Sequence, residues 1–166
     1  MAKKAKKAKR AAKRVVAKKK SVAAIPKGYH TLTASFAGPE VEKEIEFLKA
    51  AFGAKVRDLF HGPDGKVAHC EMQVGDSRVM CGTGMEGQAW TLHASVYVKD
   101  CDATFAKAVA AGATVKEPLT DKFYGDRNGR VVSPFGNEWS IGTHKEDVSP
   151  KEMERRMAEM MKGHTA

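Results

Sequence analysis

The chain carries one arrangement of elements twice between residues 29 and 144, and this internal repeat limits its fold more than any other feature. Each half reads as a short apolar run, an amphipathic helix, a Gly-Ala pair and two strands joined by a tight turn. Equivalent turns lie about sixty residues apart, as Gly75 and Gly136 do. The repeat predicts an α+β fold of two βαβββ units, whose curved sheets can enclose a cleft.

The elements expected in the two halves can be read as residue ranges. In the first half they are the apolar run 29–37, the helix 40–52, and the strands 67–74 and 77–82. In the second half they are the apolar run 91–98, the helix 102–111, and the strands 130–133 and 138–143. The dipeptide Asn128-Gly129 is typical of a hairpin turn and is expected to precede the strand 130–133.

Period-two alternation gives each predicted strand a polar face and an apolar face. The apolar faces are expected to pack beneath the helices, which carry apolar stripes of their own. These stripes are Val41, Ile45, Leu48 and Phe52 in the first helix, and Phe105, Ala108, Val109 and Ala111 in the second. The polar faces carry His69, Glu71, Gln73, His93, Ser95 and Tyr97. They either line a ligand cavity or form the solvated side of an antiparallel sheet, and the repeat favours the cavity.

Charge is distributed unevenly along the chain, which we divide into a basic arm (1–25), one globular domain (26–146) and a C-terminal segment (147–166). The basic residues of the arm are Lys3, Lys4, Lys6, Lys7, Lys9, Arg10, Lys13, Arg14, Lys18, Lys19 and Lys20. These eleven side chains exceed the net charge of +9, so the remainder carries −2. Such a segment is expected to be disordered, and it either binds DNA or RNA through phosphate contacts or only improves solubility.

Two further features bear on compartment and partners. No apolar run is long enough to span a membrane, and the three cysteines contain no CxxC pair, which together favour a cytoplasmic protein without a disulfide framework. The segment Ser149-Pro150-Lys151-Glu152 is a capping box that predicts a C-terminal helix. The methionine stripe of this helix is Met153, Met157, Met160 and Met161, and it either contacts a partner subunit or packs on its own domain.

Several segments together resemble one known family. They are Tyr29-His30-Thr31-Leu32-Thr33, Ala51-Phe52-Gly53-Ala54, Pro63-Asp64-Gly65-Lys66, His69-Cys70-Glu71, Phe123-Tyr124-Gly125-Asp126-Arg127 and Ser133-Pro134-Phe135-Gly136-Asn137-Glu138-Trp139. Over residues 26–162 the chain resembles the PhnB-like branch of the vicinal oxygen chelate superfamily, which also holds glyoxalases, bleomycin-resistance proteins and extradiol dioxygenases. The resemblance implies paired βαβββ modules that form curved half-barrel sheets, a ligand cavity within each sheet, and a homodimer.

The resemblance also implies where a divalent metal would be held. The four ligand positions, carried over by strand register, fall on Thr33, Met80, His93 and Ser140. Only the imidazole of His93 is a good ligand, so we expect no metal cofactor. An unusual metal site built from His69, Glu71 and His93 is the alternative.

The predicted ligand-binding residues are His69, Glu71, His93, Tyr97, Phe123, Tyr124 and Arg127. Arg127 either clamps a carboxylate or phosphonate of the ligand or pairs with Asp126 at the surface.

Three functions follow from these residues. The first is a metal-independent protein that binds a small organic molecule. The second is a glyoxalase-like lyase or isomerase, in which Glu71 or His93 is the general base. The third is a nucleoid-associated protein that is tethered to DNA by its arm.

Overall fold

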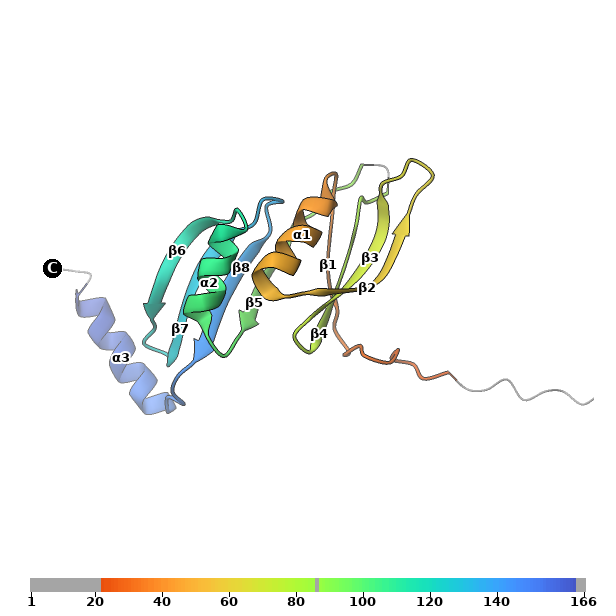
Figure 1. Ribbon diagram of the computed structural model, residues 1–166. Coiled ribbons are helices and arrows are strands. Elements are labelled where there is room, and N and C mark those ends of the chain that lie inside the picture. The colour runs from red at the N-terminus through yellow and green to blue at the C-terminus, as the bar shows by residue number, and fades with distance from the viewer. Residues whose placement is uncertain (1–21, 86, 164–166) are drawn as a thin grey trace, which may run out of the picture.

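The computed structural model describes residues 22–85 and 87–163 and shows an α+β fold of two βαβββ modules followed by a helix (Figure 1). The first module holds β1 (Ala34–Ala37), α1 (Val41–Phe52), β2 (Lys55–His61), β3 (Val67–Val74) and β4 (Ser77–Gly82). The second holds β5 (His93–Tyr97), α2 (Cys101–Ala110), β6 (Thr114–Asp121), β7 (Asp126–Val132) and β8 (Glu138–His144), and α3 (Pro150–Gly163) follows it. The basic side chains of residues 1–20, and the nucleic-acid contacts predicted for them, lie outside the described residues.

The two sheets have the same topology, which confirms the internal repeat. The first sheet has the order β1-β4-β3-β2 and the second has the order β5-β8-β7-β6. In each sheet the first strand of the module runs parallel to the last, and the other neighbours are antiparallel. The modules lie side by side, with α1 next to α2, so neither sheet is stacked face to face on the other (Figure 1).

Helix α1 forms where the sequence predicts it, because its apolar spacing and its termination signal agree. Val41, Ile45 and Leu48 are buried beneath it. Gly53 ends the helix with φ 63°, a left-handed conformation that favours glycine, and its N–H donates to the Lys49 carbonyl at 3.1 Å. The predicted range 40–52 is therefore correct to within one residue.

Helix α2 is correctly predicted in position, but its buried face differs by one residue. Phe105 and Ala108 are buried as expected, whereas Val109 is 41% exposed, so its assignment to the apolar stripe is wrong. Cys101, Phe105 and Ala108 lie at i, i+4 and i+7, and Val109 falls at the edge of the face that they form.

The predicted hairpin at Asn128-Gly129 is wrong, because both residues lie inside β7 and the turn between β6 and β7 falls at 123–125. Gly125 takes the turn with φ 96°. At Gly129 an added Cβ would lie 2.8 Å from the Glu117 carbonyl oxygen and 2.8 Å from a ring carbon of Phe105. Gly129 is therefore needed for the close approach of the β6 backbone and of Phe105 on α2, rather than for a turn.

The core runs without interruption from one module to the other. The Trp139 ring packs against Phe52, with 5.2 Å between ring centroids, which confirms the expectation that Trp139 packs beneath a helix. The cysteines at 70, 81 and 101 are free and buried. No helix within the described ranges is long and apolar enough to cross a membrane.

Helix α3 begins as the capping box predicts. The Glu152 N–H donates to the Ser149 Oγ at 3.3 Å. Arg156 joins the helix to the domain through an ion pair with Glu146 at 2.8 Å, while Met157 on the methionine stripe is 43% exposed. The stripe is therefore only partly covered by its own chain at this position.

Candidate functional site

Each sheet has one side away from its helix, and most of the predicted site residues lie on these two sides. The first open face is the side of the first sheet opposite α1, and it carries Phe60, His69, Glu71, Gln73, Arg78 and Met80. The second open face is the side of the second sheet opposite α2, and it carries His93, Ser95, Tyr97, Asn128, Arg130, Glu138 and Ser140. The alternation read from the sequence therefore placed six side chains correctly, namely His69, Glu71, Gln73, His93, Ser95 and Tyr97.

The first open face contains an apolar hollow of about 380 Å³. Its walls include Trp90, Met80, Met85 and His69. The Trp90 ring is held at the edge of the sheet by a hydrogen bond from its Nε1 to the Ser35 carbonyl at 3.2 Å, and its backbone bridges to Ala37. Sequence reasoning missed Trp90 and Met85 because both lie in the connection between the modules, where no strand or helix period applies.

The polar end of the first open face is organised around Glu71. Arg78 Nη1 lies 2.8 Å from one Glu71 oxygen, and His69 Nε2 lies 3.7 Å from the other. The neighbouring Tyr29 hydroxyl, His69 and Arg78 hold the pKa of Glu71 below its ordinary value. A carboxylate in this environment is a weak base, whereas a general base acting near neutral pH needs the opposite shift.

An ionic chain crosses the second open face. Arg130 lies between two carboxylates, with its Nε 2.7 Å from Glu117 and its Nη1 3.0 Å from Glu138. Lys116 also pairs with Glu138 and holds the pKa of that carboxyl below its ordinary value. The parallel register of β5 and β8 places Glu138 beside His93, with 3.6 Å between His93 Nε2 and the carboxylate. Ser140, the residue at the family's metal position on β8, lies opposite Ser95 in the same register.

The other end of the second open face holds a small polar pocket of about 110 Å³, lined in part by Tyr97, Tyr124 and Asn128. Buried Asp126 accepts a hydrogen bond from the Tyr97 hydroxyl at 2.7 Å and lies 2.7 Å from His144 Nδ1. This carboxylate raises the pKa of His144, with a further contribution from Asp147. The structure therefore brings Tyr97 and Tyr124, two of the predicted ligand-binding residues, to one pocket.

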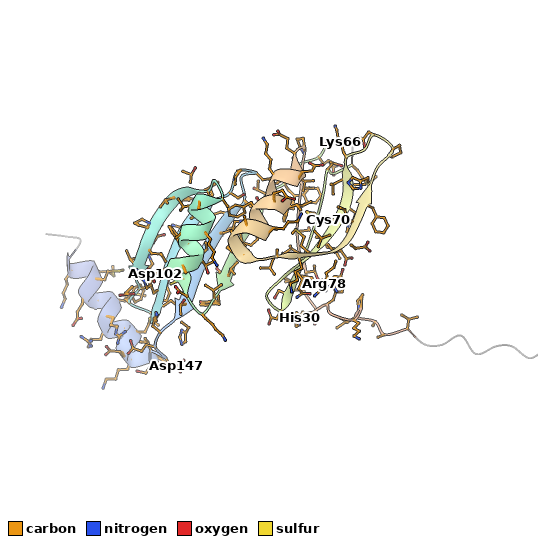
Figure 2. The ribbon with its side chains drawn as sticks, viewed as in Figure 1. His30, Lys66, Cys70, Arg78, Asp102 and Asp147 are labelled. Atoms are coloured by element: carbon orange, nitrogen blue, oxygen red, sulfur yellow. The ribbon has the colours of Figure 1, made fainter. Side chains whose placement is uncertain are left out.

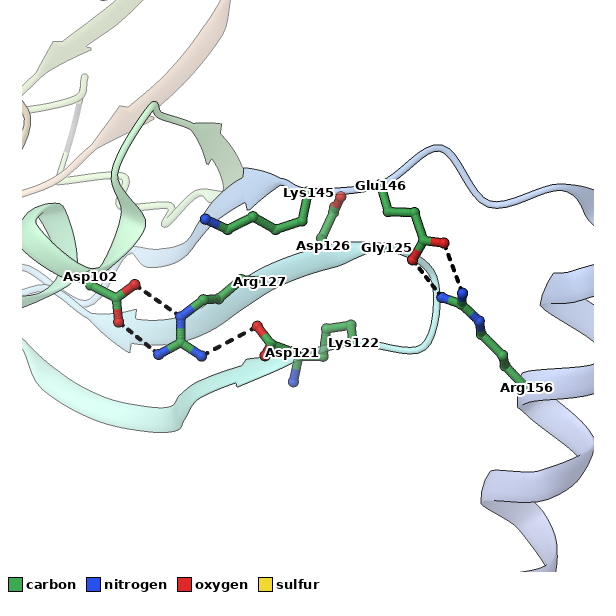
Figure 3. Close-up of a pocket in the computed structure, with 9 residues that line it drawn as sticks. All are labelled: Asp102, Asp121, Lys122, Gly125, Asp126, Arg127, Lys145, Glu146 and Arg156. Carbon is green, nitrogen blue, oxygen red and sulfur yellow. Dashed lines mark hydrogen bonds and ion pairs between the residues drawn. The ribbon is translucent and has the colours of Figure 1, made fainter.

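The other two predicted ligand-binding residues, Phe123 and Arg127, lie outside this pocket. The Phe123 ring lies in the β6–β7 turn, with its centroid 5.3 Å from that of Tyr124. Arg127 lies on the helix side of the second sheet, where it forms a two-pronged ion pair with Asp102 and a longer contact of 3.4 Å with Asp121 (Figure 3). Arg127 is thus separated from the second open face, and it pairs with Asp102 rather than with Asp126. Arg130, three residues later in the chain, lies on the second open face.

The residues at the four metal-ligand positions do not form a suitable donor set. Thr33, Met80 and Ser140 offer hydroxyl or thioether groups, which are poor ligands for a hard divalent cation. The carboxylate of Glu138 lies beside His93, but it is already paired with Arg130 and Lys116, whose charges oppose a cation there. Within residues 22–85 and 87–163, no three histidine, cysteine or acidic side chains are grouped so that they could hold an ion.

Comparison with known proteins agrees with this architecture. Residues 29–141 match the model of the Glyoxalase/Bleomycin resistance protein/Dioxygenase superfamily. An uncharacterized protein of Mycobacterium bovis is 36% identical over 128 residues, which cover 69% of this chain and 83% of that protein.

Two solved structures illustrate the likeness in fold. TioX from Micromonospora sp. ML1 is similar with a TM-score of 0.55 and 24% identity, covering 68% of this chain and 95% of TioX. A Bacillus cereus protein described as a putative 3-demethylubiquinone-9 3-methyltransferase, PhnB protein, is similar with a TM-score of 0.52 and 16% identity, covering 69% of this chain and 98% of that chain. At these identities the likeness concerns the fold alone.

Proposed function

We propose, because the chain belongs to the Glyoxalase/Bleomycin resistance protein/Dioxygenase superfamily, that it binds a small organic molecule on the first open face, as a member of the PhnB-like branch. The observation that carries this proposal is the apolar hollow beside Trp90, whose volume of about 380 Å³ is within the usual range for small ligands. Met80 and Met85 add flexible thioether side chains that adapt to a ligand's shape. His69 supplies a polar group that can orient the ligand at the rim.

A second copy of the chain is the proposed cover for this hollow. Neither open face is covered by the other sheet of the same chain, and large side chains remain exposed on both, with Phe60 55% and Tyr97 66% exposed. The second open face also presents Arg130 and His93, whose polar groups could bind polar atoms of a ligand held in the mostly apolar hollow. A homodimer in which the second open face of one copy covers the first open face of the other would therefore enclose the ligand on two sides.

Ligand binding is proposed to be independent of metal. The donor set at the family's metal positions supports this, since only one good ligand stands there and the nearest carboxylate is held by two cations. The lyase or isomerase alternative gains no support from the lowered pKa of Glu71, because that shift weakens the proposed base.

Trp90 provides the test of ligand binding. The chain has two tryptophans, of which Trp90 is 45% exposed at the hollow while Trp139 is 2% exposed in the core. A compound that enters the hollow should quench or shift the emission of Trp90, in a saturable manner. The Trp90→Phe variant retains Trp139 and should lose this response to the same compound. The proposal is wrong if a screen of small aromatic and aliphatic compounds yields no saturable response, or if the response persists in the Trp90→Phe variant.

The distribution of charge supports a second activity, which is attachment to nucleic acid through residues 1–20. This segment has eleven basic side chains and no acidic one, whereas the rest of the chain carries −2. Lysine and arginine neutralise phosphates without regard to base sequence and release counterions. We propose that the arm localises the ligand-binding domain to a polyanion.

A further inference from the structure

Before it enters the first sheet, the chain passes one end of the first open face, where it meets Arg78 and Glu71. The apolar run predicted at 29–37 becomes a strand only at β1, and residues 22–33, which we call the strap, precede it. A tight turn shapes the strap, since the Tyr29 N–H donates to the Pro26 carbonyl at 3.1 Å and Gly28 has φ 85°. Figure 2 shows His30 and Arg78 at the end of the first sheet where the strap meets it, and His30 Nε2 lies 3.3 Å from the Asp76 carbonyl.

One aromatic residue holds the strap to the sheet. The Arg78 guanidinium lies over the Tyr29 ring, 4.7 Å from its centroid, and the same guanidinium pairs with Glu71. The side chains of Arg78 and Glu71 are only 16% and 19% exposed, so the cation–π contact and the ion pair are partly shielded from water. The fit is close, because a Cβ added to Gly28 would lie 3.0 Å from Arg78 Nη2. Tyr29, Arg78 and Glu71 thus form a latch.

Besides the latch, the exposed contact between His30 and the Asp76 carbonyl joins the strap to the sheet. Val22 is 91% exposed and Leu32 is 81% exposed, so its apolar side chains bury little surface against the sheet. A segment with few buried apolar contacts opens at a low cost in free energy. The latch is therefore the main restraint on a segment that would otherwise move away from the sheet.

The strap forms most of the wall of a second hollow, which adjoins the first. This hollow has a volume of about 370 Å³, and Ile25, Pro26, Tyr29 and Met80 line it. Met80 also lines the hollow beside Trp90, so one side chain stands between the two spaces. Because strap residues form most of the wall of this second hollow, displacement of the strap would remove that wall and uncover the surface of the first sheet beside Met80 and Glu71.

We propose that the strap sets the size of the ligand that the first open face admits, and that Tyr29 is the specificity-determining residue that holds it in place. This inference rests on the proposed function. With the latch closed, a ligand is confined to the hollow beside Trp90. With the latch open, a longer ligand extends past Met80 into the space that the strap had covered.

Two dyes of different length test the proposal on the full chain. The probes are 1-anilinonaphthalene-8-sulfonate and its longer dimeric form, titrated against the wild type, Tyr29→Ala and the matched strap control Lys27→Ala. If the open state is a minor population of about one tenth, removing the latch should tighten binding of the dimeric dye about tenfold. Binding of the single dye should change by less than about twofold, and Lys27→Ala should behave as the wild type, because the described residues give Lys27 no ion pair.

Trypsin cleavage after Lys27, followed by mass spectrometry, tests the latch without any ligand. Cleavage should be about tenfold faster in Tyr29→Ala than in the wild type, while the emission of buried Trp139 shows that the fold is retained. Equal cleavage rates would overturn the inference, as would an unchanged ratio of the two dye affinities. If the single dye binds neither the wild type nor any variant, both the proposed function and the inference are wrong. If the single dye binds all three proteins but the ratio of the two dye affinities is the same in each, only the inference is wrong.

Discussion

Trp139 in the second module donates its indole N–H to Glu44 of the first module at 2.9 Å, and both side chains are buried. This contact joins α1 to β8 across 95 residues of sequence. Burial raises the pKa of Glu44 above its ordinary value, because the charged form loses its hydration. The junction between the modules therefore contains an acid whose neutral form is favoured more in the folded chain than in water.

The first prediction concerns the pH dependence of stability at this junction. A carboxyl whose pKa is raised on folding binds its proton more tightly in the folded state, so stability falls as pH rises above the unfolded pKa and up to the folded pKa. The Glu44→Gln variant removes this loss and keeps an acceptor for Trp139. The difference in unfolding free energy between variant and wild type should grow with pH, by up to about 1.4 kcal/mol per pH unit. Urea denaturation from pH 4 to 8 measures it, with exposed Glu46→Gln on α1 as the control. Parallel pH profiles for wild type and Glu44→Gln would contradict it.

The second prediction concerns His144, whose pKa is raised by Asp126 and then by Asp147. A base with a raised folded pKa contributes stability that is fully present below its unfolded pKa and is lost as pH rises through the folded value. The histidine resonances followed by NMR should show His144 titrating above the ordinary range near 6.5. The Asp126→Asn variant should lower that pKa, while the exposed His61 serves as an internal control. A His144 pKa that does not respond to Asp126→Asn would show that the 2.7 Å contact does not determine it.

The third prediction concerns metal content. Protein purified without chelator should contain zinc, nickel and manganese at well below one equivalent per chain, because the four family positions offer a single good ligand. Adding these ions should leave the melting temperature unchanged in both the wild type and His93→Ala. Stoichiometric metal that is lost in His93→Ala would instead establish a metal centre and favour the lyase or isomerase function.

The fourth prediction concerns the glycine inside β7. The Gly129→Ala variant places a methyl group against the Glu117 carbonyl and the Phe105 ring, so it should destabilise the fold by about 1–3 kcal/mol. Gly62→Ala is a matched control, since the one tight contact of its added Cβ is with the flexible end of the Asp64 side chain, at 2.9 Å. Chemical denaturation of both variants gives the comparison. Equal stabilities would mean that both the β6 backbone and the Phe105 ring can shift away from residue 129 at no cost.

The fifth prediction concerns the basic arm. Full-length protein should bind duplex DNA with an affinity that falls steeply between 50 and 200 mM salt, by about a thousandfold if six or more phosphates are neutralised. A chain that begins at residue 21 should lose this binding and keep its response to ligands at Trp90. Fluorescence anisotropy with a labelled duplex measures both proteins. If they bind DNA equally, the arm is not the binding element.

The sequence predicts most of the elements because their signals are local. The strands 67–74 and 77–82 agree with the observed β3 and β4, and Ser149 caps α3 as expected. The Asn128-Gly129 hairpin failed because a local turn preference was overridden by packing, since α2 approaches the sheet at Gly129. Alternation along β7 places Arg130 on the second open face and Arg127 on the side that faces α2. The position of Arg130 could therefore have been predicted from the sequence.

Sequence by itself determined the repeat, the two faces of each strand and the concentration of positive charge in one terminal segment, because periodicity and composition belong to the chain whatever its partners. Only the tertiary structure decided which side chains meet. Strand register set Glu138 beside His93, the connection between modules carried Trp90 to the first open face, and the strap brought Tyr29 beneath Arg78. These contacts join residues that are far apart in sequence, and no local pattern encodes them, because they depend on how sheets, helices and connections pack against one another.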